Sequence, residues 1–315
     1  MSTTWALSDG RAGNARQATA LAEAMDSDVT SLALQPRAPW RWLAPHSAPG
    51  AMRAFGSRFS DACAHPPALA IGCGRQAALA TRLLRGRGSR VVQILDPRID
   101  PRHWDCVVAP AHDGLRGANV IHTLGSLHPV DDLWLARARQ AFPALGDLPG
   151  PRTVLLIGGP GRHAALGDVD FDALLERLAA QALGEGGSLL ALASRRTPQA
   201  WCNAMAQVPR GVPGIRWRDA GDGANPYAGA LGWADRIVCT PDSVNMLSEA
   251  AATLAPVFAW APERVTGRPR GFLDALRASG RVREVDGALA PFAAEPLRET
   301  ARVAAELRQR LDARG

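Results

Sequence analysis

The sequence predicts an α/β protein built from two Rossmann-like domains. Short runs of β-branched and apolar residues alternate with stretches of helical periodicity, which favours parallel sheets covered by helices. The length of 315 residues is sufficient for two such domains. The alternation is interrupted at residues 146–151, where Gly-Asp-Leu-Pro-Gly-Pro is typical of a linker. We therefore expect an N-terminal domain over residues 1–147, a second domain over residues 148–290, and a C-terminal helix over residues 291–315 that packs on the N-terminal domain.

The first domain begins with a strand at residues 4–7, a turn at residues 8–13 that contains glycines, and a helix. This order opens a doubly wound sheet, which binds its ligands at the carboxyl ends of its strands. The turn lacks the full glycine pattern of a dinucleotide site, so a plain tight turn is the alternative. The further strands are expected at residues 28–34, 68–71, 91–95, 106–109 and 120–124, with helices at 77–84 and 131–141.

The second domain repeats this plan. A strand at residues 153–157 ends in a loop that starts at Gly158, whose glycines allow a ligand to approach the backbone closely; a bare glycine turn is the alternative. Another strand ends at Arg195 and Arg196, where two adjacent guanidinium groups suit a diphosphate clamp; a solvated loop is the alternative. The remaining strands are expected at residues 188–193, 215–218, 236–239 and 257–260, with helices at 171–183, 227–234, 272–278 and 294–312.

A helix is expected directly after the strand at residues 236–239. Thr240 can cap its first turn, and a proline at the next position loses no needed N–H group there. The helix N-terminus, which includes Ser243, is a ready site for an anion. Because Asp242 is acidic, we expect its side chain to turn away from a phosphate and to cap the helix or to meet a sugar.

Three polar side chains share one face of this helix, because Asp242, Asn245 and Glu249 are spaced by three and four residues. The alanines at residues 250–252 leave room for a ligand beside Glu249. A carboxylate at Glu249 can accept hydrogen bonds from a ribose diol while phosphates bind at the helix start. This layout is typical of a nucleotide diphosphate site, and an ordinary amphipathic helix with a solvated glutamate is the alternative.

The chain contains no lysine, and all 36 basic residues are arginines. This excludes a conventional pyridoxal-phosphate enzyme, which needs a Schiff-base lysine, and an ordinary P-loop NTPase. Phosphates must therefore be bound by arginines, backbone N–H groups and helix ends. The net charge of +6 and the pI near 9.8 indicate an anionic partner. No helix-turn-helix, zinc-finger or RNA-recognition pattern supports nucleic acid, so we expect none.

The positions of the cysteines and histidines and the hydropathy of the chain indicate whether the protein binds a metal and where in the cell it is found. The five cysteines are scattered and form no CxxC pair, which fits a reducing cytoplasm. The histidines form no metal-binding motif, so we expect no zinc site. The sequence has no apolar run of about 18 residues and no signal-peptide pattern at its start. We therefore expect no transmembrane helix and a cytoplasmic location.

The stretch at residues 35–60 combines tryptophan and other apolar residues with arginines. This mixture is typical of a membrane interface, where aromatic rings lie at headgroup level and arginines meet anionic lipids. We expect peripheral contact with an anionic inner-membrane surface through residues 37–59; the alternative is that the tryptophans fill the core. The residues concerned are Arg37, Arg41, Arg53 and Arg58, together with Trp40, Trp42, Leu43, Met52, Phe55 and Phe59.

Taken together, these motifs resemble the mitochondrial-fission (elongated-mitochondria) family, whose bacterial members are regarded as glycosyltransferases of the GT-B fold. The segment Asp242-Ser243, Glu249-Ala250 and Pro256-Val257 is similar to the donor-site helix of such enzymes. The other matching motifs are Ser8-Asp9-Gly10-(x)2-Gly13-(x)3-Gln17-Ala18, Gly72-Cys73-Gly74-Arg75, Asp96-Pro97-Arg98, Leu156-Ile157-Gly158-Gly159-Pro160 and Ser194-Arg195-Arg196-Thr197-Pro198.

The resemblance implies that the two domains face each other across a cleft and that the C-terminal helix returns to the first domain. The second domain would bind a nucleotide-diphosphate sugar of the UDP type, and the first a lipid-linked or cell-envelope acceptor, with no metal and no prosthetic group. Arginines, helix dipoles and the N–H groups of Gly159 and Gly161 would stabilise the leaving diphosphate. The donor-binding residues would be Gly158, Gly159, Gly161, Ser194, Arg195, Arg196, Asp242, Ser243, Asn245 and Glu249.

An inverting transferase of this fold needs a general base from the first domain. Asp9 and Asp96 are the candidates for this catalytic role, because each follows a strand and would face the cleft. A plain loop-capping role is the alternative for both. The acceptor-side residues would be Gly10, Arg11, Gly13, Gly74, Arg75 and Arg98.

Two other functions remain open. A nucleotide-sugar epimerase on the same fold would need no membrane patch and would place several acidic and histidine groups around the sugar, of which this chain shows fewer. A non-catalytic adaptor is open because the plant relatives that named the family are linked to organelle division through partner recruitment. The nucleotide-site residues argue against an adaptor, which has no use for them.

Overall fold

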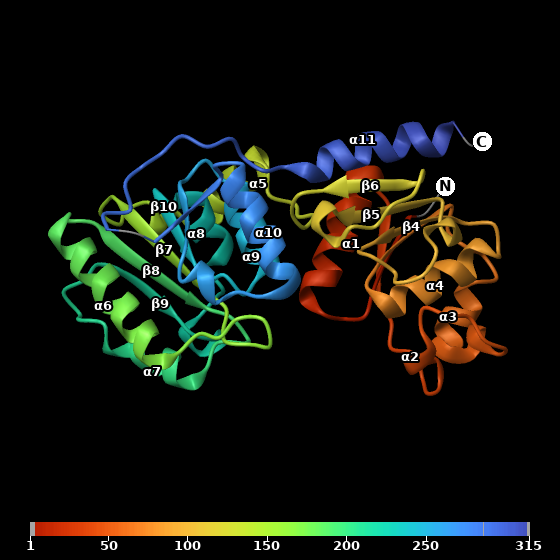
Figure 1. Cartoon of the computed structure of the whole chain (residues 1–315), viewed down its shortest axis with the longest axis horizontal. Helices are drawn as coiled ribbons and strands as arrows, with labels where there is room; N and C mark the ends of the chain where they lie inside the picture. The colour runs from red at the N-terminus through yellow and green to blue at the C-terminus, as the bar shows by residue number, and fades with distance from the viewer. Residues whose placement is uncertain (1–3, 286, 314–315) are drawn as a thin grey trace. The chain divides into compact units, whose positions relative to one another are not determined.

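The computed structural model describes residues 4–285 and 287–313, without the side chains of Arg58 and Ala62 (Figure 1). The chain divides into two compact units. Unit 1 contains the residues up to Pro129 and those from Arg298 on, and unit 2 contains Val130–Leu297. Each unit is built on a six-stranded sheet whose strands all pair in parallel. The expected α/β class with two Rossmann-like units is confirmed.

The sheet of unit 1 has the strand order β2-β1-β3-β4-β5-β6. Its strands are β1 (Thr4–Ser8), β2 (Val29–Ala33), β3 (Leu69–Cys73), β4 (Arg90–Ile94), β5 (Cys106–Pro110) and β6 (Val120–Thr123). Its helices are α1 (Ala12–Met25), α2 (Trp40–Leu43), α3 (Ser57–Ala62), α4 (Arg75–Arg85) and α11 (Glu299–Asp312), with the 3-10 turns η1 (Ala51–Phe55), η2 (Pro101–His103) and η3 (Ala111–Asp113). Because side chains alternate along a strand, Trp5 and Leu7 pack on one face with α3 and α4, and Ala6 packs on the other with α1 and α11. Helices therefore cover both faces, which explains the continuous apolar runs of these strands.

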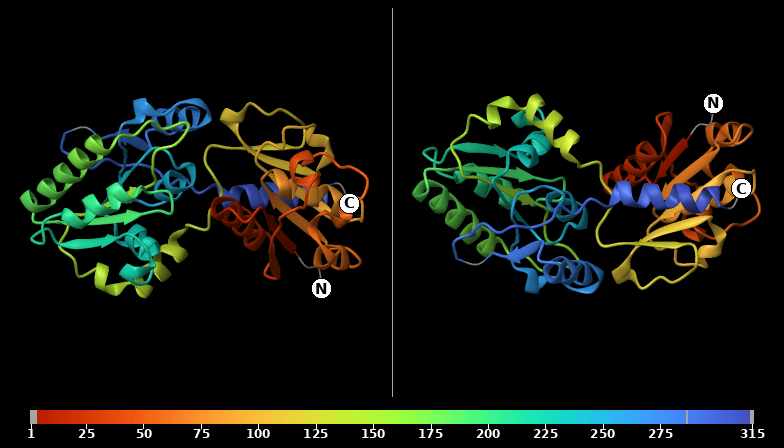
Figure 2. Two further views of the ribbon diagram at one scale, coloured as in Figure 1. Left: turned by 90° about the horizontal axis from the view of Figure 1, so that it is seen from below. Right: turned by 90° about the horizontal axis from the view of Figure 1, so that it is seen from above.

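The last helix, α11, lies against α1, as Figure 2 shows from two sides. Val303, Leu307 and Leu311 form its buried stripe at helical spacing. The carboxylate of Glu299, its first residue, accepts a hydrogen bond from the backbone N–H of Leu124 at 2.6 Å. The expected return of the C-terminal helix to the first domain is confirmed.

The sheet of unit 2 has the order β12-β11-β10-β7-β8-β9. Its strands are β7 (Arg152–Ile157), β8 (Ser188–Ala193), β9 (Gly214–Trp217), β10 (Arg236–Cys239), β11 (Val257–Ala259) and β12 (Val282–Glu284). Its helices are α5 (Asp132–Ala141), α6 (Asp168–Gly184), α7 (Gln199–Gln207), α8 (Tyr227–Trp233), α9 (Val244–Ala251) and α10 (Gly267–Ala278), with the turns η4 (Pro143–Leu145), η5 (Ala220–Asp222) and η6 (Pro262–Arg264). In its core, the rings of Phe171 and Trp201 stack with centroids 4.2 Å apart, and Trp260 meets both edge-on.

Helix α5 packs within unit 2 on α8. The guanidinium of Arg139 donates to the carbonyl of Gly232 at 3.0 Å, and the ring N–H of Trp233 donates to the carbonyl of Phe142 at 3.0 Å. The expected domain boundary between residues 147 and 148 lies after α5, whereas the compact units divide before it.

Several elements differ from the expected ranges, among them β12, α10 and α11. Strand β12 was not predicted, because a three-residue strand with two charged side chains has no clear apolar pattern. Helix α10 starts at Gly267 and not at residue 272. Helix α11 starts at Glu299 and not at residue 294, because Pro296 lacks an N–H group and the N–H of Leu297 donates to the carbonyl of Ala251 at 2.8 Å.

Each sheet has one point at which the order of the strands reverses. It lies between β1 and β3 in unit 1, and between β7 and β10 in unit 2. Open parallel sheets bind ligands outside the carboxyl ends of their strands at such a point. The loops after these four strands are therefore where a site is expected in each unit.

Candidate functional site

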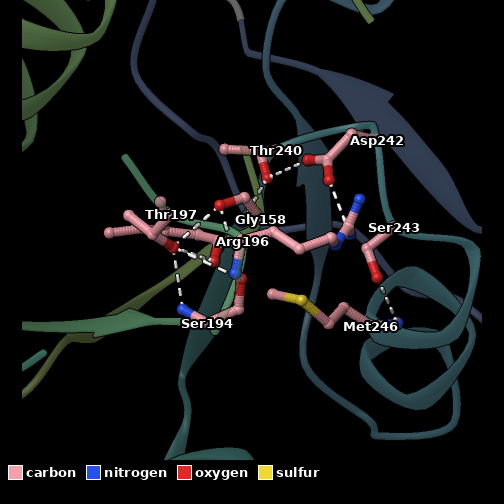
Figure 3. A network of polar contacts seen from close by, with 9 residues as sticks. Gly158, Ser194, Arg196, Thr197, Thr240, Asp242, Ser243 and Met246 are labelled. Atoms are coloured by element: carbon pink, nitrogen blue, oxygen red, sulfur yellow. Dashed lines mark hydrogen bonds and ion pairs between the residues drawn. The ribbon is translucent and has the colours of Figure 1, made fainter. Parts of the chain in front are cut away.

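The loop after β7 is held by two threonines from its neighbouring strands (Figure 3). Thr240, directly after β10, accepts a hydrogen bond from the N–H of Gly158 at 2.7 Å. Thr197, shortly after β8, donates its hydroxyl proton to the carbonyl of Gly158 at 2.7 Å and accepts from the N–H of Ser194 at 2.8 Å. We call these two threonines and Gly158 the Gly158 clamp. It fixes both backbone polar groups of one residue at the reversal point of the sheet.

The threonines of the clamp were expected to have another role. Each precedes a proline, and Thr240 was expected to cap the following helix. The cap of α9 is instead Ser243, whose hydroxyl accepts from the N–H of Met246 at 3.5 Å, and the residue at the cap of α7 is Pro198. The expectation for Thr240 is therefore wrong: the hydroxyl turns back to the loop of β7 because β10 is paired directly with that strand.

Close packing explains two glycines of the loop. A Cβ atom on Gly158 would lie 2.2 Å from the carboxylate of Asp242, and one on Gly159 would lie 2.3 Å from the carbonyl oxygen of Arg196. Any larger residue would push these groups away. Gly161 differs, because its N–H donates to the carbonyl of Ala164 at 3.0 Å and so is not available to a phosphate, contrary to expectation.

Asp242 is the buried charge of this site. Its side chain is 3% exposed, and its Oδ1 accepts a hydrogen bond from the Thr240 hydroxyl at 2.7 Å. Its Oδ2 lies 2.7 Å from Nη2 of Arg196, an ion pair without hydrogen-bond geometry, so that among the described residues Oδ2 has no hydrogen-bond donor. Asp242 neither caps α9 nor points outward; it lies against the glycine loop and holds Arg196, whose side chain is 52% exposed.

Helix α9 carries the remaining donor candidates. Ser243 and Asn245 are half-buried in its first turn, and Glu249 is only 4% exposed. The solvated glutamate that the sequence left open is therefore excluded. The far end of α9 is capped by the buried Arg281, whose guanidinium donates to the carbonyls of Ala251 at 2.7 Å and Thr253 at 2.7 Å. Burial lowers the pKa of Arg281 to about 10, which leaves it charged near neutrality.

Further basic groups surround the loop after β7. Arg195 and Arg162 are exposed, and the guanidinium of Arg162 donates to Nε2 of His163 at 3.1 Å. The carbonyl of His163 accepts from the N–H of Thr266 at 2.9 Å, which ties the loop to the start of α10. Arg162 and His163 were not predicted as site residues, although they directly follow the glycine loop.

In unit 1, Asp9 lies in the corresponding place after β1. Its Oδ1 accepts hydrogen bonds from the N–H of Arg11 at 3.1 Å and from the side-chain amide of Asn14 at 3.0 Å. Gly74, after β3, has a φ of +89°, and a Cβ atom there would lie 2.6 Å from the Asn14 amide nitrogen. The neighbouring strands therefore bring Asp9 and Gly74 together, while Gly10 forms the turn with a φ of +79°.

A polar hollow of about 310 Å³ opens beside Asp9. Its lining comes from four segments: the turn after β1, the chain after β2, the first turn of α2 and the first turn of α4. The lining residues are Asp9, Arg11, Gln35, Pro36, Arg41 and Gln76. Gln35, Arg41 and Gln76 were not predicted as site residues, because they are distant in sequence and share no motif.

The other acceptor-side candidates occupy separate places. Asp96 accepts a hydrogen bond from the N–H of Arg98 at 2.8 Å and pairs with its Nε at 3.3 Å, and it is not among the residues that line the hollow. Arg98 has a φ of +65°, which is uncommon for a residue with a side chain. Gly13 lies within the first turn of α1, and Arg75 begins α4.

The stretch at residues 35–60 has a mixed burial. Phe59 is buried, and Trp40, Met52 and Phe55 are half-buried against the core, so the core alternative holds for these four. Trp42 and Leu43 are 70% and 43% exposed, together with the exposed Arg37, Arg41 and Arg53. The side chain of Arg58 lies outside the described residues.

Metal-binding groups and membrane-spanning helices can be assessed for residues 4–285 and 287–313. Among these residues, no group of three or more His, Cys, Asp or Glu side chains is placed to hold a metal ion. None of the described helices is both long and apolar enough to span a bilayer.

Comparison with known sequences gives one family. The family model described as "Mitochondrial fission ELM1" matches residues 12–311. Mitochondrial fission protein ELM1 of Arabidopsis thaliana is 30% identical over 280 residues, which are 79% of this chain and 65% of the plant protein. The chain thus spans just under two thirds of that relative. An uncharacterised protein of Rickettsia prowazekii, RP120, is 23% identical over 82% of this chain and 83% of its own length.

The solved structures that match include two UDP-GlcNAc 2-epimerases and a plant protein in complex with UDP. The UDP-GlcNAc 2-epimerase of Methanocaldococcus jannaschii matches with a TM-score of 0.54 and 10% identity, over 98% of this chain and 100% of that one. The UDP-GlcNAc 2-epimerase of Neisseria meningitidis, bound to UDP-GlcNAc, matches with a TM-score of 0.52 and 12% identity, over 98% and 100%. Os79 of O. sativa, in complex with UDP, matches with a TM-score of 0.53 and 11% identity, over 98% and 91%. At such identities the likeness shows the fold, which is the expected GT-B type.

Proposed function

The chain belongs to the mitochondrial fission ELM1 family, and we propose that it is a glycosyltransferase that moves a sugar from a nucleotide-diphosphate donor. The donor is of the UDP type, and the acceptor is lipid-linked or part of the cell envelope. The observation that carries the proposal is the Gly158 clamp, because it fixes a glycine loop at the reversal point of a parallel sheet, beside the start of α9.

The donor diphosphate lies at the start of α9 and against Arg195 and Arg196. The positive end of the helix dipole favours an anion there, and a guanidinium can form two hydrogen bonds to one phosphate. Asp242 positions Arg196, because the ion pair between them holds the guanidinium beside the glycine loop. Glu249 accepts hydrogen bonds from the ribose, with Asn245 one turn before it on the same face.

We propose that these arginines and the start of α9 neutralise the negative charge of the leaving diphosphate. The proposed reaction therefore needs no metal. Each charge-assisted hydrogen bond contributes about 1.5–3 kcal/mol when it forms in a partly buried site. The cost of reorganisation is small because Asp242 and Thr240 already fix the surrounding groups.

Unit 1 supplies the acceptor side, and Asp9 is the better candidate for the general base. Asp9 lines the hollow of about 310 Å³, whereas Asp96 does not. Arg11 also lines the hollow and pairs with the Asp9 carboxylate at 3.5 Å. Gly10 and Gly74 shape the turn around it. Gly13, Arg75 and Arg98 are not among the residues that line the hollow.

We propose a cytoplasmic location. The five cysteines are free and buried, which fits a reducing compartment.

A second candidate function is nucleotide-sugar epimerisation, favoured by the whole-chain likeness to two UDP-GlcNAc 2-epimerases. A third is a non-catalytic adaptor, favoured by the kinship to the plant fission protein. A thermal-shift panel of nucleoside diphosphates and their sugars, followed by product analysis of the best ligand, separates the three. Release of the nucleotide with transfer of the sugar supports the transferase, a new epimer supports the epimerase, and no stabilisation by any nucleotide rejects both.

A further inference from the structure

A small patch on unit 1 combines exposed apolar and basic side chains. Trp42 and Leu43 are adjacent, and among the described residues of unit 1 they are the exposed large apolar side chains. Single exposed apolar residues are common, but a neighbouring tryptophan and leucine in one segment with several exposed arginines are typical of interfacial segments. We call Trp42, Leu43, Arg37, Arg41 and Arg53 the α2 patch.

The charged side chains of the chain segment that carries the patch have one sign. Between Asp28 and Asp61 the sequence contains four arginines and no aspartate or glutamate. Arg37, Arg41 and Arg53 are exposed in this segment. A surface of this kind attracts anionic partners, and the apolar pair adds an affinity that charge alone does not give.

Hydrogen bonds from helix α4 fix the backbone of the segment that carries the α2 patch. The guanidinium of Arg75 donates to the carbonyls of Arg41 at 3.3 Å and Trp42 at 3.4 Å. The guanidinium of Arg82 donates to the carbonyl of Pro45 at 2.6 Å. Ala44 is buried in a small core cluster directly behind the exposed pair. Trp42 and Leu43 are therefore exposed on a segment whose backbone is fixed by these contacts.

From this combination we infer that the α2 patch docks unit 1 on an anionic phospholipid surface. Trp42 and Leu43 enter the headgroup region, and the arginines contact lipid phosphates. Arg41 belongs both to the patch and to the hollow beside Asp9, so the hollow adjoins the docked surface. Access of a lipid-borne acceptor to Asp9 from that surface is a consequence that rests on the proposed function; the docking itself does not.

The test is co-sedimentation of the full chain with phosphatidylcholine vesicles that contain or lack phosphatidylglycerol, at low and high salt, without nucleotide. We expect binding only to the anionic vesicles, with release by salt. The double substitution Trp42→Ser and Leu43→Ser should lower the partition coefficient at least about tenfold. The substitutions Arg37→Gln and Arg53→Gln should weaken binding at low salt.

The matched control is Val169→Ser, because Val169 is another exposed apolar residue, on unit 2. It should bind vesicles as the unaltered chain does, and both serine variants should keep the unaltered melting temperature. The inference is overturned if the chain stays in solution with anionic vesicles at low salt. It is also overturned if the double variant binds as well as the control, which would assign the patch to a protein partner or to none. Because the assay contains no nucleotide, a lack of vesicle binding would not count against the proposed donor site.

Discussion

Thr197 and Thr240 bind the two backbone groups of the same residue: one hydroxyl donates to the carbonyl of Gly158, and the other accepts from its N–H, both at 2.7 Å. The two threonines follow the strands on either side of β7. Their positions explain why the glycine loop is fixed although it contains little side-chain packing of its own. The donor site of the proposed transferase depends on this arrangement.

Thr240→Val should leave the N–H of Gly158 without its partner. Thr197→Val should remove the shorter of two hydrogen bonds to the Gly158 carbonyl, the other coming from the Ser194 hydroxyl at 3.4 Å. We expect a loss of about 1–3 kcal/mol in the free energy of unfolding and a weaker affinity for nucleoside diphosphates. Chemical denaturation and calorimetric titration measure the two effects. Thr81→Val is the matched control, since Thr81 is a buried threonine of unit 1 that accepts from the ring N–H of Trp104 at 2.8 Å. It should lower stability but leave nucleotide affinity unchanged; equal effects on nucleotide binding would argue against the clamp.

Arg196→Lys should weaken binding of a nucleoside diphosphate at least about tenfold, because an ammonium group cannot reproduce the two-pronged contact of a guanidinium. The same binding should persist in EDTA, since the proposed site uses no metal. Arg210→Lys, at an exposed arginine in the chain between α7 and β9, is the control and should bind normally. Loss of binding in EDTA with recovery in magnesium would show that a metal carries the charge.

The ion pair of Glu185 with Arg236 gives a prediction about pH. Arg236 is buried, donates from Nε to the Thr153 hydroxyl at 2.7 Å and pairs with Glu185. Hydrogen bonds from Arg236 hold the pKa of Glu185 below its ordinary value of 4.5. A carboxylate with a lowered folded-state pKa stabilises the fold above the unfolded pKa, and this contribution is lost as the pH falls through the folded value.

Glu185→Gln should therefore lower the melting temperature at pH 7, and the difference from the unaltered chain should shrink as the pH falls below the ordinary carboxyl pKa of 4.5. Asp274→Asn is the control. Asp274 pairs with Arg270 four residues before it, and the side chains of Asp274 and Arg270 are 48% and 39% exposed. That exchange should change the melting temperature at pH 7 little. If the difference in melting temperature between Glu185→Gln and the unaltered chain stays constant between neutral and acid pH, the ion pair with Arg236 does not stabilise the fold in the way proposed.

The two sheets could be predicted from the sequence because strands covered on both faces are continuous apolar runs, as in Val154–Ile157 and Leu189–Ala193. Strand β12 could not, because two of its three residues are charged. The start of α9 was expected too early, since a threonine before a proline is common both at helix starts and at strand ends.

The candidate site could be predicted only where its residues are close in sequence. Gly158 and Arg196 were predicted from their positions after strands and Asp242 from its place on the expected helix, and the structure brings the three together. The direction of the Thr240 hydroxyl depends on which strand pairs with β10, and this is set by the sheet order and not by local sequence. Arg281 was missed for a similar reason, because it caps α9 from a distant segment.

Glu249 offers the most direct test of the donor site. Its carboxylate is buried on the helix that starts beside the Gly158 clamp, and the proposal assigns it to the ribose of the donor. Glu249→Gln keeps the size of the side chain and removes its charge, and Glu176→Gln, at an exposed glutamate of α6, is the matched control. Circular dichroism and the melting temperature establish that each variant is folded.

The measurement is calorimetric titration of UDP into the unaltered chain and the two variants. The unaltered chain and Glu176→Gln should bind UDP equally. Glu249→Gln should bind it at least about tenfold more weakly, which corresponds to a loss of about 1.5–3 kcal/mol from a charge-assisted hydrogen bond. A folded Glu249→Gln variant with unchanged affinity, or an unaltered chain that binds no nucleoside diphosphate, would contradict the account.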